Sequence, residues 1–217
     1  MKIKITIPDS LKEIPLWRYQ QFEKMKADEQ DDELIARLLV SNFCNIPFDL
    51  IDKLDVNTYN LAVQTIANAL TDKPSLTKRF KFQGVEYGFI PKLDKMTMAE
   101  FVDCDTYISD IEQWHRLMAI FYRPITKKIG IFYDIEEYEG SDKYCEIMKQ
   151  VPVEYAMGAM VFFWNLGNKL ATHMILSLEE TLTEEQHILL KQILETNGDG
   201  INPFTLLHKA MSSSLMK

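Results

Sequence analysis

The stretch VPVEYAMGAMVFFWNLGNKLATHMILSL, residues 151–178, decides the fold. Pro152 suits the first turn of a helix, where its missing N–H is not needed. Residues 156–164 are all apolar or glycine, which predicts a helix without a polar face that is buried on all sides. Asn165 ends this run well short of the roughly 20 apolar residues of a membrane span. We therefore expect the central core helix of a soluble domain near residues 152–176.

The composition is that of an ordinary globular protein. Of the 217 residues, 47% are hydrophobic and 26% are charged, and the net charge is −8. An acidic chain is a poor candidate for a general nucleic-acid binder, which neutralises phosphates with basic patches. It remains compatible with a surface that DNA slides past without sticking. The three cysteines are far apart and odd in number, which favours reduced thiols. The start MKIKITIP lacks the long apolar block of a signal peptide.

Apolar side chains at helical spacing predict several further helices. They lie at residues 15–22, 31–43, 47–54, 56–70, 98–121, 141–150, 183–194 and 203–207. Thr97 and Glu100 have the spacing of a capping box, so a helix is expected to begin near Met98. It runs on, or steps into a second helix, until Pro124 stops it.

At the amino terminus, Ile3, Ile5 and Ile7 alternate with polar residues. This alternation predicts a half-buried strand with one apolar face. The strand could join a sheet within the chain or lend an edge to a neighbouring subunit. These three isoleucines are therefore the candidate subunit-contact residues.

Two further regions have β character. Residues 80–90 are rich in aromatic and β-branched side chains and predict a hairpin that turns at Gln83-Gly84. A second β-rich run covers residues 129–135. We expect all three β-rich regions to share one small sheet, which makes the fold α+β and mainly α-helical. The favoured organisation is a single domain over residues 1–217; the alternative is a helical subdomain at 1–75, ending in the linker Thr71–Ser75, and an α+β core at 76–217.

The sequence contains one neighbourhood rich in carboxylates. It comprises Asp94, Glu100, Asp103, Asp105, Asp110 and Glu112. No histidine lies among them at a recognised ligand spacing, so a solvated helix face is a better interpretation than a metal site. Cys104 and His115 could in principle act as nucleophile and base. Nothing in the sequence brings these two residues together, and no third member or oxyanion motif accompanies them.

Other motifs for bound ligands are incomplete. The segment 195–200 resembles the first half of an EF-hand loop, but Leu206 stands where the loop needs glutamate and Pro203 interrupts it. The glycines belong to no phosphate-binding motif. The aromatic hairpin could stack nucleic-acid bases with help from neighbouring basic residues, although core packing is the favoured interpretation. We therefore predict no catalytic, cofactor-binding or metal-binding residues, no enzymatic activity and no cofactor.

Three segments carry a resemblance to a known group of proteins. They are KFQGVEYGFIPKLDKMTMAEFVDCDTYI at 81–108, WHRLMAIFYRPI at 114–125 and VPVEYAMGAMVFFWNLGNKL at 151–170. Together they resemble small proteins encoded in the structural gene blocks of tailed bacteriophages, especially crAss-like phages. The motifs are packing motifs, and they match no established functional position.

The resemblance implies a virion protein that is assembled in the cytoplasm of the bacterial host. Its expected role is part of a ring or connector at the portal vertex, neck or tail. Its expected partners are further copies of itself and other virion proteins, such as the portal and neighbouring ring or tail proteins. Packaged DNA would pass close by, and no membrane is involved. Two alternatives stay open: a tail assembly chaperone that is absent from the finished particle, and an enzyme or host-directed regulator.

Overall fold

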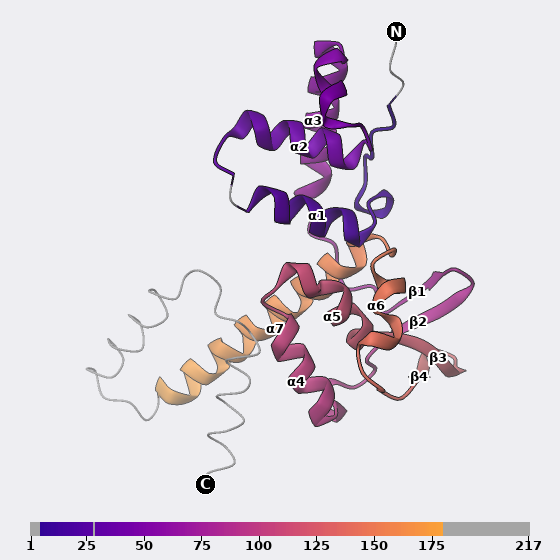
Figure 1. Ribbon diagram of the computed structural model, residues 1–217. Helices are drawn as coiled ribbons and strands as arrows, with labels where there is room; N and C mark the ends of the chain where they lie inside the picture. The colour runs from indigo at the N-terminus through magenta and orange to yellow at the C-terminus, as the bar shows by residue number, and fades with distance from the viewer. Residues whose placement is uncertain (1–4, 28, 180–217) are drawn as a thin grey trace. The chain divides into compact units, whose positions relative to one another are not determined.

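The computed structural model describes residues 5–27 and 29–179, and the chain forms two compact units, Met1–Gly158 and Ala159–Lys217 (Figure 1). The described helices are α1 Leu16–Lys26, α2 Asp32–Phe43, α3 Val56–Leu70, α4 Met98–Tyr107, α5 Trp114–Phe121, α6 Asp142–Met148 and α7 Val153–Glu179. Short 3₁₀ helices cover Leu11–Glu13, Phe48–Lys53, Leu93–Lys95 and Ile111–Gln113. The helices predicted at 183–194 and 203–207 lie outside the described residues.

Four strands form one antiparallel sheet in the order β1-β2-β3-β4. Their bounds are β1 Arg79–Phe82, β2 Val85–Phe89, β3 Tyr122–Ile129 and β4 Phe132–Ile135. The prediction of a mainly helical α+β fold with a small sheet is therefore confirmed. The single domain over 1–217 and its alternative division near residue 75 stay predictions.

Local signals in the sequence place several elements. Gln83 and Gly84 have φ angles of 48° and 82°, and the hairpin turns there as predicted, with both residues in the left-handed region that such tight turns require. The Thr97 hydroxyl accepts from the main chain of Glu100, and the Glu100 carboxylate accepts from the main chain of Thr97. The predicted capping box and the helix start at Met98 are thus confirmed.

The end of α5 differs from the prediction. The helix stops at Phe121, and Pro124 lies inside β3, opposite Tyr87 of β2. The Phe121 carbonyl accepts from the N–H of Ile90 at 2.9 Å, so the chain has already joined the sheet. At Pro124 the pairing with β2 ends, and the pairing with β4 begins next to an irregularity between Ile125 and Lys127. A proline fits here because it has no N–H to donate to a continuous ladder.

The predicted amino-terminal strand is wrong for the residues that the structure describes. Ile5 and Ile7 lie in a segment with no secondary structure, and Ile3 lies outside the described residues. The sheet therefore unites the other two β-rich regions without this one. Alternation is a local pattern, and it does not determine whether a segment finds a strand to pair with. The subunit-contact role of Ile3, Ile5 and Ile7 stays a prediction.

The starts of α1 and α7 are joined through the main chain. Pro15 and Pro152 form an isolated antiparallel bridge. Leu16 N–H donates to the carbonyl of Val151 at 2.8 Å, and Val153 N–H donates to the carbonyl of Ile14 at 2.8 Å. The first N–H groups of a helix have no partner within it. Here a residue just before each helix start provides the carbonyl that accepts from a first-turn N–H of the other helix.

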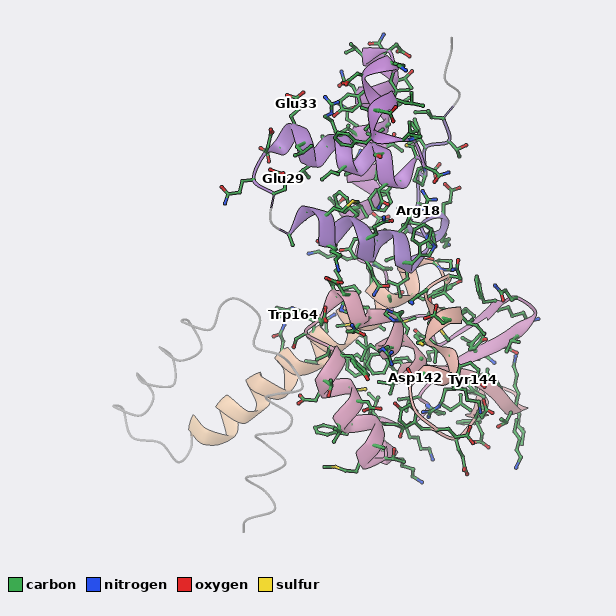
Figure 2. The ribbon with its side chains drawn as sticks, viewed as in Figure 1. Arg18, Glu29, Glu33, Asp142, Tyr144 and Trp164 are labelled. Atoms are coloured by element: carbon green, nitrogen blue, oxygen red, sulfur yellow. The ribbon has the colours of Figure 1, made fainter. Side chains whose placement is uncertain are left out.

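Helix α7 is buried on one face in its described part. Val153, Ala156, Ala159 and Phe163 are buried, whereas Trp164 is 47% exposed. The prediction of burial on all sides is therefore wrong at Trp164, which Figure 2 labels. An apolar side chain is buried only where neighbours cover it, and the run of apolar residues contains no information about that cover.

Gly158 lies where α7 passes very close to the chain at Ser75. A Cβ atom built on Gly158 would lie 2.6 Å from the main-chain oxygen of Ser75 and 3.2 Å from its carbonyl carbon. Main-chain atoms cannot swing aside as a side chain does, so only glycine fits without a shift of the helix or the segment.

We expect Gly158→Ala to lower the free energy of unfolding by about 1–2 kcal/mol, because the steric cost exceeds the roughly 1 kcal/mol that alanine gains in helix propensity. Asn60→Ala, at an exposed position of α3, is the control and should be neutral or slightly stabilising. Urea denaturation measures both. A Gly158→Ala variant as stable as the control would show that the close approach relaxes without cost.

Candidate functional site

A buried ion pair lies inside the carboxylate-rich region. Glu100 of α4 and Arg123 of β3 have side chains only 5% and 7% exposed, and Arg123 Nη1 lies 2.5 Å from Glu100 Oε1. The interpretation of this neighbourhood as a solvated helix face is therefore wrong for Glu100. The reason is the partner, because a carboxylate enters the interior when a cation and hydrogen-bond donors accompany it.

The surroundings of this pair are half-buried at Tyr138 and Asp103 and buried at Cys104. The Arg123 guanidinium lies 5.4 Å from the ring centre of Tyr138, and the Tyr138 hydroxyl donates to Asp103 Oδ2. Burial raises the pKa of Tyr138, and the hydrogen bond to Asp103 raises it further. Cys104 is fully buried. These contacts join α4 to β3 and to the segment after β4. Because the charged pair at their centre is buried, we interpret the cluster as structural.

The remaining carboxylates of this neighbourhood have other positions. Asp110 caps the 3₁₀ helix that begins at Ile111, and Glu112 forms a 2.6 Å ion pair with Lys24. Asp94 and Asp105 are exposed. These four carboxylates are exposed to solvent, so the interpretation of the neighbourhood as a solvated surface is confirmed for them.

His115 is engaged with a residue other than Cys104. His115 Nδ1 lies 3.1 Å from Gln20 Nε2, and Gln20 also donates to the carbonyl of Ile111 at 2.7 Å. Burial lowers the pKa of His115 and raises that of Cys104, with neighbouring carboxylates adding to the latter shift. Such a thiol is a weak nucleophile, because the thiolate is the reactive form.

The aromatic hairpin is used for core packing, as favoured. Phe80 is 6% exposed. Its ring stacks on Tyr155 of α7 with ring centres 4.2 Å apart, and it also packs on Tyr87 and Tyr122. A base could stack on Phe80 only if these partners left it. The ring of Tyr144 in α6, which Figure 2 labels, is nearly perpendicular to the ring of Tyr87, with ring centres 6.2 Å apart.

An apolar hairpin tip is the surface feature that stands out. At the turn between β3 and β4, Ile129, Ile131 and Phe132 are 80%, 77% and 74% exposed. Gly130 between them has a φ of +60°. The β-rich pattern of residues 129–135 predicts a strand, but it does not predict this exposure. The signal was present, because a hairpin turn is normally polar and this one carries large apolar residues on both sides of its glycine.

Two other features, a metal site and a membrane-spanning helix, are absent from the described part of the chain. No three His, Cys, Asp or Glu side chains among residues 5–27 and 29–169 gather closely enough to hold a metal ion. No helix in those ranges combines the length and apolar content needed to cross a bilayer. The segment 195–200, which was considered as a calcium loop, lies outside them.

Comparisons with protein-family models, with curated proteins and with solved structures find no match to this chain. The candidate site therefore stands on the geometry of its own residues. That geometry places the Glu100–Arg123 ion pair in the interior and an apolar tip at the surface.

We expect Arg123→Met to destabilise the protein by about 3–5 kcal/mol, because it leaves the buried Glu100 carboxylate without its cation. Glu100→Gln added to Arg123→Met should recover at least about 2 kcal/mol, since glutamine carries no charge and can still accept in the capping box. Urea denaturation of the single and double variants measures both effects. A double variant no more stable than Arg123→Met would contradict the account.

The native thiols should be unreactive. Burial raises the pKa of Cys44 to about 11 and moves the pKa of Cys104 up as well, and Cys145 is buried. At pH 8 the first two therefore remain protonated, whereas ordinary cysteines are partly ionised. Ellman's reagent should react slowly with the folded protein and rapidly with three thiols after unfolding. One thiol that reacts rapidly in the folded state would revive the nucleophile hypothesis.

Proposed function

We propose that the protein is a structural component of a tailed-phage virion, where it forms part of a ring or connector at the portal, neck or tail. Two lines support this proposal: the resemblance of three segments to proteins of phage structural gene blocks, and the distribution of apolar side chains. The proposed action is contact between proteins, without chemical turnover.

The observation that carries the proposal is the exposed tip of the β3–β4 hairpin. Three neighbouring apolar side chains there are at least 74% exposed. Contiguous apolar surface on a water-exposed protein commonly marks a place where another molecule docks. A short hairpin that projects such side chains is suited to a pocket or helix surface of a neighbouring subunit.

The charge of the chain suits a position beside DNA. A net charge of −8 repels phosphates, so a ring of such subunits would let DNA pass without holding it. A ring also needs contacts between two different surfaces of identical subunits, because such contacts propagate until the rotation closes. The apolar tip supplies one of these surfaces.

The test is quantitative mass spectrometry of purified virions of the phage whose genome encodes the chain. We expect the protein to be present at a fixed small multiple of the portal copy number, since a closed ring has a fixed number of subunits. Portal and major capsid proteins in the same sample calibrate the count. Presence in infected cells with absence from virions would overturn the ring and favour the tail assembly chaperone.

A further inference from the structure

Within the part of the chain that the structure describes, one basic residue of the hairpin forms no ion pair. Lys127 of β3 is exposed and forms no ion pair with a described residue, whereas its neighbour Lys128 is paired with Glu86 at 2.8 Å. The tip therefore combines the apolar side chains of Ile129, Ile131 and Phe132 with an exposed lysine, which lies opposite the exposed Asp134 of β4 without forming an ion pair with it. A matching surface would be apolar and would carry an available carboxylate nearby.

Helix α4 carries such a surface. Met98 is 73% and Val102 is 47% exposed, and residues four apart lie on the same side of a helix. Asp105 lies one turn further on, is exposed, and forms no ion pair with a described residue. We call Met98, Val102 and Asp105 the α4 outer face. Methionine suits a docking surface because its side chain adapts to the shape of its partner.

We propose that the β3–β4 tip of one copy docks on the α4 outer face of a second copy, with Lys127 beside Asp105. The chemistry of the two surfaces is complementary, apolar against apolar and cation against anion. Their exposure shows that they do not cover each other within one chain. Since the two surfaces differ, the contact is heterologous and repeats from subunit to subunit, as a ring requires.

The charge of the chain favours this occupant over a lipid surface. An apolar tip beside lysines could also enter a membrane, but a chain of net charge −8 is repelled by anionic headgroups. Against a second copy the same overall repulsion exists, and it is weakest where a cation meets an anion. The chain itself carries the apolar surface and the exposed carboxylate that the tip requires of a partner, on the α4 outer face.

Helix α3 is the competing acceptor and supplies the control. Leu61 is 57% exposed, so it is as accessible as Val102. Its exposed neighbours are the amides Asn57, Asn60 and Gln64, which need hydrogen-bond partners that the apolar tip cannot offer. No residue within α3 is charged, and the carboxylate of its N-cap, Asp55, already accepts from the main chain and the hydroxyl of Thr58.

Disulfide trapping tests the contact with full-length protein. Phe132→Cys protein is mixed with Val102→Cys protein and, separately, with Leu61→Cys protein under mild oxidation. The three native cysteines are buried and do not compete. We expect at least about tenfold more linked heterodimer with Val102→Cys, which corresponds to roughly 1.4 kcal/mol of preference. Equal yields, more product with Leu61→Cys, mainly Phe132→Cys homodimer, or no linked product in any mixture would overturn the proposal.

A charge exchange tests the ionic contact. Lys127→Glu in the Phe132→Cys chain, or Asp105→Lys in the Val102→Cys chain, should lower the yield by about threefold to fivefold, the effect of one exposed pair. Both exchanges together should restore the yield, because the pair is reversed but intact. A combined variant as poor as the single ones would overturn the proposed placement of Lys127 beside Asp105.

The contact rests on the proposed ring, and the two can fail separately. Absence from virions together with selective trapping would leave the contact between copies standing and remove the ring function. Presence in virions at a fixed copy number without selective trapping would support the ring function and overturn the proposed contact.

Discussion

The reciprocal pairing of two helix starts is the constraint on which unit Met1–Gly158 depends. Leu16 and Val153 each donate a first-turn N–H to the chain just before the other helix. Ile14, Leu16, Val151 and Val153 are almost completely buried, so water cannot replace these bonds. A buried donor without a partner costs about 1–3 kcal/mol. These bonds join the start of α1 to the start of α7. They involve main-chain atoms only, so they do not depend on the identity of the side chains.

The orientation of α4 follows from a second constraint. Glu100 and Cys104 lie four residues apart on one side of the helix, and both are buried. The ion pair with Arg123 holds that side against β3. Met98 and Val102 then point to the opposite side, where they are exposed. A polar interaction in the interior thus determines which apolar side chains the protein presents to its surroundings.

Local chemistry made part of this structure predictable. The turn at Gln83-Gly84 and the capping box at Thr97 each depend on residues close in sequence, and the structure has both. Interactions between distant residues were not predictable in the same way. Glu100 is in the interior because of Arg123, and Trp164 is partly exposed because nothing covers it. The β3–β4 tip was interpreted as strand, since periodicity reports which residues alternate and not where a hairpin projects.

The bridge between Pro15 and Pro152 also has a consequence for the order of folding during synthesis. Helix α1 leaves the ribosome early, but Val151, which accepts from Leu16, follows only after most of the unit has been made. At typical elongation rates this delay is on the order of ten seconds. Contacts between residues so far apart in sequence also form slowly in a free chain. Until then, the apolar surface with which the nascent α1 packs on the later helices stays exposed to water. A molecular chaperone would bind the nascent chain most readily during this period.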